Sequence, residues 1–185
     1  HPDKVLIYDE MEAKKPVRWD WLLHSPVPFS INEQTKQLTT RNEVKQFEAV
    51  AQLFSSQDCA ITQTDRFVAP PDEKKAGRGE ALANQWHLTA SFAPSKRNRI
   101  LTIIQVQADG KKVSEIVCEG SASHSCNRLH CGDWINEAEL DTRKPASFQI
   151  FNETNGAMFS YGKSSLSVEG KSYKPARKEA SVLFD

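Results

Sequence analysis

Two tryptophans, an arginine and a histidine lie close together in a segment of alternating polarity. Residues 17–24 read VRWDWLLH, so Trp19 and Trp21 fall on one face of a predicted strand and Arg18 on the other. Exposed indoles would form a platform on which sugar rings stack, whereas the large apolar area of aromatic side chains favours the core. His24 ends the segment. When protonated it could pair with a uronate carboxylate, and the alternative is a structural histidine with a satisfied hydrogen bond.

Short basic clusters are the second chemical signal. They are Lys14, Lys15 and Arg18; Lys74, Lys75 and Arg78; and Lys96, Arg97 and Arg99. Such clusters could meet an acidic sugar, although most charge runs are solvated turns. We therefore take as candidate glycan contacts Trp19, Trp21, His24, Arg18, Arg97 and Arg99. Lys plus Arg equals Asp plus Glu at 24 each, which argues against nucleic acid as a partner.

The densest group of potential metal ligands is a run of histidines and cysteines, His124, Cys126, His130 and Cys131. Zinc prefers four N or S ligands in a tetrahedron, and this run lacks the paired CxxC spacing of zinc sites. The sequence therefore predicts no metal and no cofactor, with His124, Cys126 and His130 as the only candidates. A disulfide from Cys118 to Cys126 or Cys131 across a hairpin is an alternative. Buried free thiols, with Cys59 among them, are the default.

No catalytic constellation is evident. The chain contains neither a Gly-x-Ser-x-Gly elbow nor a glycine-rich phosphate loop. Asp133 and Glu137 are of the type that glycosidases use, but sequence spacing does not fix the ~5–9 Å separation such a pair needs. We expect no enzyme activity from this chain alone.

The elements that would position these residues are β-strands. Hydrophobic residues make up 38% and charged residues 26%, a globular composition. Apolar or alternating runs predict strands at 4–9, 17–24, 29–31, 37–40, 47–54, 59–64, 85–92 and 99–106. The last of these is apolar enough for a central strand buried on both faces. A polar loop is expected at 70–83.

The character of the chain changes near residues 108–112, where Asp109-Gly110 is a hairpin signal. Short strands are predicted beyond it at 113–118, 127–140, 147–152, 157–161, 166–169 and 181–185. The expected fold is all-β: an antiparallel β-sandwich that is part of a larger supersandwich, at 1–108, followed by a small β-sandwich domain at 109–185. A cut sheet leaves an open edge, so dimerisation through that edge is also predicted.

Several stretches resemble the C-terminal β region of heparinase II/III-like polysaccharide lyases. Residues 5–13 (VLIYDEMEA), 16–17 (PV) and 19–25 (WDWLLHS) carry the first part of the resemblance, and 101–106 (LTIIQV) look like a later strand. The small final domain of the heparinase II type is similar to 132–135 (GDWI), 138–141 (AELD) and 144–147 (KPAS).

The resemblance implies a parent protein in which an α/α-toroid domain comes first and carries the catalytic groups. Such parents cleave uronic-acid polysaccharides by β-elimination, bind zinc upstream of the region matched here, and are periplasmic or secreted in bacteria. No catalytic or metal residue carries over to this chain. It opens HPD and enters a strand-like run at once, without a signal peptide, so we expect a piece of a longer protein. No apolar run approaches the ~18 residues of a membrane span.

The favoured interpretation is a non-catalytic β module that supports the toroid domain and contacts acidic glycan. Two alternatives from other classes stay open. An independent carbohydrate-binding module would expose Trp19 and Trp21, and a complete small hydrolase or lyase would gather titratable groups around one pocket.

Overall fold

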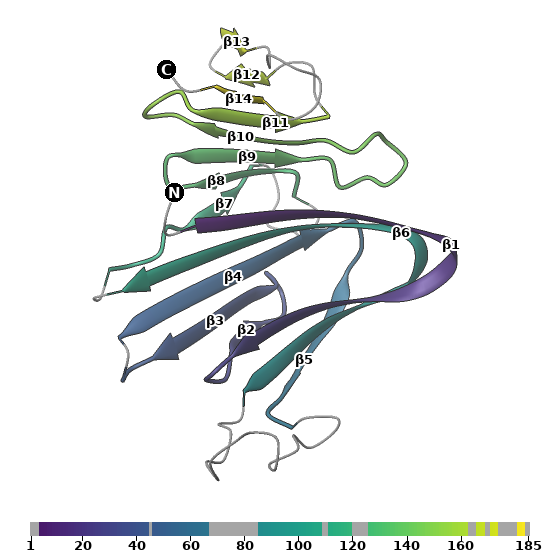
Figure 1. Ribbon diagram of the computed structural model, residues 1–185, viewed down its shortest axis with the longest axis vertical. Coiled ribbons are helices and arrows are strands. Elements are labelled where there is room, and N and C mark those ends of the chain that lie inside the picture. Colours follow the sequence, from purple (N-terminus) through teal and green to yellow (C-terminus); the bar gives the residue numbers. More distant parts are fainter. Residues whose placement is uncertain are drawn as a thin grey trace, which may run out of the picture.

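The computed structural model describes residues 4–44, 46–66, 85–108, 111–119, 126–162, 166–168, 171–173 and 181–183. Strands are the only regular elements in these segments, so the predicted all-β fold is confirmed (Figure 1). All strand pairs are antiparallel, in two six-stranded sheets and one two-stranded ribbon. None of the described segments is a helix long and apolar enough to cross a membrane.

The first sheet uses the first six strands of the chain. They are β1 (Lys4–Ser25), β2 (Ser30–Asn32), β3 (Gln37–Asn42), β4 (Phe47–Ser55), β5 (Cys59–Thr64) and β6 (Trp86–Ala108). The strand order is β1-β6-β4-β3-β2, and β5 also pairs with β6. The second sheet begins at residue 116, close to the predicted break in the chain.

The second sheet has the order β14-β11-β10-β9-β8-β7. Its strands are β7 (Ile116–Cys118), β8 (Arg128–Cys131), β9 (Trp134–Ala138), β10 (Phe148–Asn152), β11 (Met158–Tyr161) and β14 (Ser181–Leu183). The ribbon consists of β12 (Leu166–Val168) and β13 (Lys171–Tyr173). The strand expected at 127–140 is two strands, because Gly132 takes a left-handed φ of 60° and turns the chain between β8 and β9.

The two longest strands bend, so that the first sheet folds over on itself. The breaks predicted at 10–16 and 93–98 are wrong, because β1 and β6 run through them as continuous strands. Glu12 pairs with Arg97 and Val17 pairs with Ser95, so β1 carries extra residues at the bend. Such bulges bend a strand and increase its twist. Figure 1 shows β1 and β6 curving together.

The bend produces two layers. The last nine residues of β6 pair with β4, and residues 87–92 near its start pair with β5 on the same edge. The two halves of the first sheet therefore face each other across a core. Residues of both layers meet in one cluster, including Leu38 and Leu53 from one side with Leu88 and Phe92 from the other.

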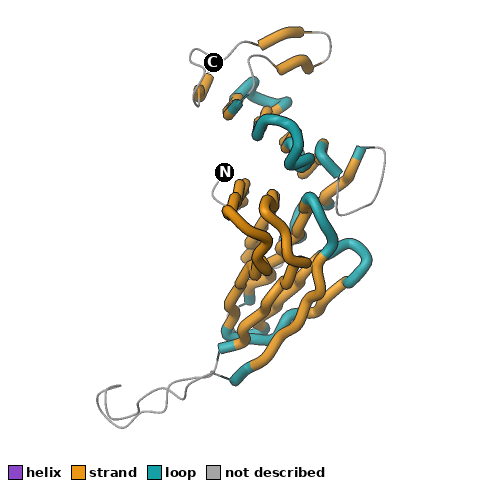
Figure 2. The backbone as a smooth tube through the Cα atoms, turned by 90° about the vertical axis from the view of Figure 1, so that its right-hand side faces the viewer, coloured by secondary structure: helices purple, strands orange, loops and turns teal. Residues whose placement is uncertain are grey.

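A second core joins the two sheets. Phe54, Leu101 and Ile103 of the first sheet pack against residues of the second, among them Leu129 and Phe148. Since β6 contributes Ile100 to the first cluster and Leu101 to the second, the prediction of a central strand buried on both faces is confirmed. Figure 2 shows the second sheet stacked above the folded first sheet. The division into domains at 1–108 and 109–185 stays a prediction.

Candidate functional site

Trp19 and Trp21 lie on the inner face of the bent sheet. Both pack against the cluster between the two layers, and Trp19 Nε1 donates to the carbonyl oxygen and the hydroxyl of Ser95 at 3.2 and 3.1 Å. The predicted alternation is present, since Trp19, Trp21 and Leu23 join this core while Arg18, Asp20 and Leu22 are exposed. Both indoles are thus partly buried and directed toward the core between the two layers.

Arg18 lies on the opposite, solvent-facing side of the same strand. Its guanidinium binds Asp20 Oδ2 through Nε at 3.2 Å and Nη2 at 2.9 Å, and Ser91 donates to Asp20 Oδ1 at 2.7 Å. The hydrogen bond from Ser91 and the neighbouring Arg18 lower the pKa of Asp20. Arg18 is accessible to an anionic ligand, but its charge is largely compensated by Asp20.

Arg97 is a second exposed candidate for glycan contact. Its Nε and Nη2 donate to Glu12 Oε1 at 3.1 and 2.8 Å across the bend. Lys14, Lys15 and Lys96 are exposed near the same bend, whereas Lys74, Lys75 and Arg78 lie outside the described residues. The bend therefore carries surface cations of which Arg97 is already paired.

Arg99 differs from the other candidates because its side chain is only 5% exposed. It joins the two sheets, donating to the carbonyl oxygens of Glu139 at 3.2 Å, Asp141 at 2.7 Å and Lys144 at 2.8 Å. A fourth hydrogen bond reaches Glu10 Oε1 at 2.9 Å. The prediction of a surface contact is corrected here, because Arg99 is buried and three of its four hydrogen bonds satisfy carbonyls of the loop between β9 and β10.

His24 is exposed on the outer face, and the histidine opposite it went unnoticed in the sequence. The two residues are register partners on β1 and β6, and His24 Nε2 lies 3.2 Å from Nδ1 of His87. The rings meet edge to face, with centroids 4.5 Å apart. His24 therefore points away from the face that holds Trp19 and Trp21.

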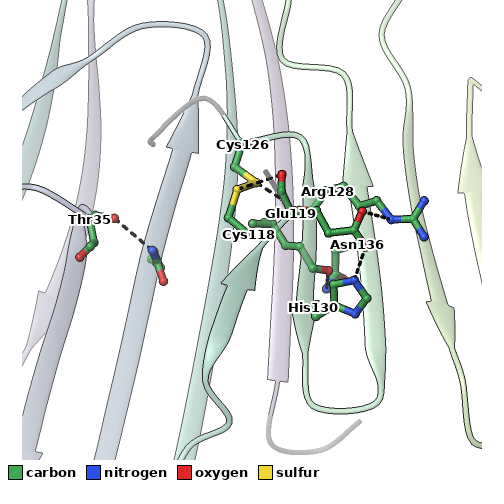
Figure 3. Close-up of a disulfide and its surroundings, with 9 residues drawn as sticks. Thr35, Cys118, Glu119, Cys126, Arg128, His130 and Asn136 are labelled. Carbon is green, nitrogen blue, oxygen red and sulfur yellow. Dashed lines mark hydrogen bonds and ion pairs between the residues drawn. A yellow bond between two sulfur atoms is a disulfide. The ribbon is translucent and has the colours of Figure 1, made fainter. Parts of the chain in front are cut away.

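The candidate metal ligands of the second sheet have other partners. Cys126 forms a disulfide with Cys118, one of the two pairings predicted, so it is not a thiolate ligand. Nε2 of His130 lies 2.5 Å from Oε1 of Glu119, which also binds Arg128 (Figure 3). The hydrogen bond from His130 and the charge of Arg128 lower the pKa of Glu119. Within the described residues no three potential ligands come together, and His124 lies outside them.

The two carboxylates of the glycosidase type also have structural roles. Asp133 accepts a hydrogen bond from the Thr154 hydroxyl at 2.9 Å. Glu137 binds Arg128 at 2.5 Å and accepts from the Gln149 amide.

The most distinctive surface lies where the second sheet extends beyond the first. On the inner face of the second sheet, Leu129 is fully buried, Phe148 is 7% exposed and Tyr161 is 43% exposed. In Figure 1, β10, β11 and β14 lie beyond the edge of the first sheet that β1 forms. Burial thus decreases outward across the sheet, because the first sheet ends while the second continues.

An aromatic groove of about 360 Å³ lies under this overhang. Its walls, here called the edge groove, are Leu6, Tyr8, Glu10, Phe148, Phe159 and Tyr161. Tyr8 stacks on Phe148 at 5.6 Å between ring centroids, and its hydroxyl donates to the carbonyl of Glu139 at 2.8 Å. Burial of the Tyr8 phenol raises its pKa to about 12. The sequence analysis did not predict this groove. Phe148 and Ile150, and likewise Phe159 and Tyr161, are two residues apart and so share one face of the second sheet, which is the pattern that could have indicated it.

The strand beside the edge groove has an open side. β1 is 22 residues long and pairs with β6 on one side, and no strand in the described part of the chain pairs with its other edge. Val5 and Leu22, near its two ends, are 53% and 59% exposed. Proteins normally cover or shorten such edges, because a row of unpaired N–H and C=O groups recruits other strands.

Comparison with known proteins found no relative of this chain. No protein-family model matches the chain, and no curated protein matches it significantly.

Proposed function

We propose that this chain is a non-catalytic β module of a heparinase II/III-like polysaccharide lyase, and that it receives the rest of its parent along β1. The observation that carries the proposal is the open β1 edge beneath the overhanging second sheet. A supersandwich that continues past β1 would place its next strand there.

The geometry of the edge groove suits an added strand. Neighbouring strands lie ~4.8 Å apart, and stacked sheets lie ~10 Å apart. A strand paired with β1 would therefore lie under β10 and β11, against Phe159 and Tyr161. Full burial of a large apolar side chain contributes ~1.5–3 kcal/mol, so covering the two rings favours docking.

The surroundings of the candidate residues are consistent with a module that supports a catalytic domain. Arg18 and Arg97 are surface cations that could contact acidic polysaccharide at the rim of a cleft in the parent, with His24 nearby on β1. The Cys118–Cys126 disulfide supports a periplasmic or secreted location, since disulfides persist in oxidising compartments. An independent carbohydrate-binding module is less well supported, because Trp19 and Trp21 are partly buried against the core between the two layers.

Two assays on the isolated chain test the non-catalytic assignment and the open edge. Incubation with heparinoids or alginate should give no rise in unsaturated-uronate absorbance, and a steady rise would contradict the assignment. Solution size measurement should detect dimers through β1, and Tyr161→Lys should weaken them by placing a charge in the edge groove. Glu153→Lys, at an exposed turn of the second sheet, is the matched control. A monomer at all concentrations would count against an open β1 edge that recruits another strand.

A further inference from the structure

A pair of histidines on the outer face of the bent sheet has the geometry of a metal chelate. His24 and His87 are directly opposite each other on β1 and β6, and the same face holds Thr64 of β5 opposite His87. Their facing nitrogens, Nε2 of His24 and Nδ1 of His87, lie 3.2 Å apart. The pair is 63 residues apart in sequence, so only the sheet register brings the rings together.

The separation of the two nitrogens matches what one metal ion requires. With metal–nitrogen bonds of ~2.0–2.1 Å, two imidazoles in a tetrahedral complex have nitrogens ~3.3 Å apart, and in a square-planar complex ~2.9 Å. The observed 3.2 Å falls between these values. An ion could therefore replace the contact between the two rings with little movement of the backbone.

The sheet also fixes the two side chains in advance. Ladder pairs continue on both sides of the histidines, from Leu22 with Thr89 to Ser25 with Trp86. His24 is exposed and His87 is half-buried, so an ion can approach from solvent while one ring is held in place. Preorganisation of this kind lowers the entropic cost of binding.

We propose that His24 and His87 form a bidentate imidazole site for a divalent transition metal, with water completing the coordination. The Irving–Williams order gives Cu²⁺ the highest affinity, ahead of Ni²⁺ and Zn²⁺. On binding, the ring that donates to its neighbour moves its proton to its other nitrogen, so that both facing nitrogens offer lone pairs. This site is independent of the proposed lyase-module function.

The test uses a variant in which these two are the only histidines left. The chain has five, so His1→Ala, His124→Ala and His130→Ala leave His24 and His87. Titration with Cu²⁺ or Ni²⁺ should give one site, with two imidazole nitrogens in the electron paramagnetic resonance spectrum of the Cu²⁺ form. Adding His24→Ala should weaken binding about tenfold or more, because the second imidazole no longer binds intramolecularly.

Stability provides a second readout. Ni²⁺ at a concentration near the dissociation constant of the two-histidine variant should raise the melting temperature of that variant and raise that of its His24→Ala derivative much less, since stabilisation follows affinity for the native state. His87→Gln should behave like His24→Ala. Equal affinity with and without His24, a spectrum with one nitrogen, or no binding at millimolar metal would overturn the proposal.

Discussion

Replacing Arg99 by Ala should destabilise the chain far more than the same change at Arg97. The two residues lie on one strand and each binds a carboxylate, but Arg97 and Glu12 have side chains 54% and 65% exposed whereas Arg99 is 5% exposed. An exposed pair contributes ~0–1 kcal/mol. Arg99 also donates three hydrogen bonds to main-chain carbonyls of the second sheet's 139–144 segment.

The magnitude follows from those three bonds. A hydrogen bond to a charged group contributes ~1.5–3 kcal/mol, and loss of one member of a buried charge network costs about 3–5 kcal/mol. We take about 3–5 kcal/mol in place of the sum of three such bonds, because the partly exposed 139–144 segment can recover water and Glu10 is 45% exposed. Arg99→Lys keeps the charge without the planar fork, so it should fall between Arg99→Ala and the natural chain.

Urea unfolding followed by tryptophan fluorescence measures this difference. With ~2 kcal/mol per molar urea as a typical slope, Arg99→Ala should lower the midpoint by about 1.5–2.5 M, and Arg97→Ala by less than about 0.5 M. Equal shifts for the two variants, or a loss below about 1 kcal/mol for Arg99→Ala, would refute the idea that Arg99 joins the sheets.

Three further predictions concern pH, the disulfide and backbone conformation. Because burial raises the pKa of Tyr8 to about 12, the folded state holds the phenol proton more tightly than the unfolded state does. The contribution of Tyr8 to stability is therefore present below pH ~10 and is lost between pH ~10 and pH 12. Phenolate absorbance and urea unfolding at each pH check this. Reducing the Cys118–Cys126 disulfide, with a sequence separation of 8, should cost about 2–3 kcal/mol in urea unfolding, and no loss would contradict its structural role. Gly162→Ala should destabilise the folded state more than Gly156→Ala. Both glycines have positive φ, but only at Gly162 would the added methyl carbon lie 2.2 Å from a backbone oxygen. Similar melting temperatures for the two variants would contradict this.

The period-two patterns were sufficient to predict most strands and their faces. The alternation from Trp19 to Leu23 separates core from surface, and the continuous apolar run at 99–106 marks a strand buried on both faces. Both features depend only on which face of its own strand a side chain occupies, and the local sequence pattern determines that directly.

The bend at the middle of β1 and β6 was not predictable in the same way. Residues 13–16 and 93–97 are polar or contain proline, which is typical of a turn. In the structure they lie within the continuous strands β1 and β6, at the two register shifts of their ladder, because a strand can bulge there without breaking. The bend then decides which residues share a core.

Contacts that depend on the pairing register of β1 and β6 could also not be predicted from the sequence. Arg99 belongs to a basic run that suggests a surface turn, yet the folded-over sheet points it at the second sheet. His24 and His87 become neighbours only because β1 and β6, which are far apart in sequence, pair in this register. Sequence distance carries no information about either contact.

The most direct test of the proposed module is hydrogen exchange along β1 in two forms of the protein. The isolated chain is compared with the longer parent protein that the proposal implies. The amides of β1 that do not pair with β6 should exchange rapidly in the isolated chain and slowly in the parent, while the amides of β4, which lies between β6 and β3, stay protected in both. Rapid exchange along β1 in the intact parent would contradict docking at this edge.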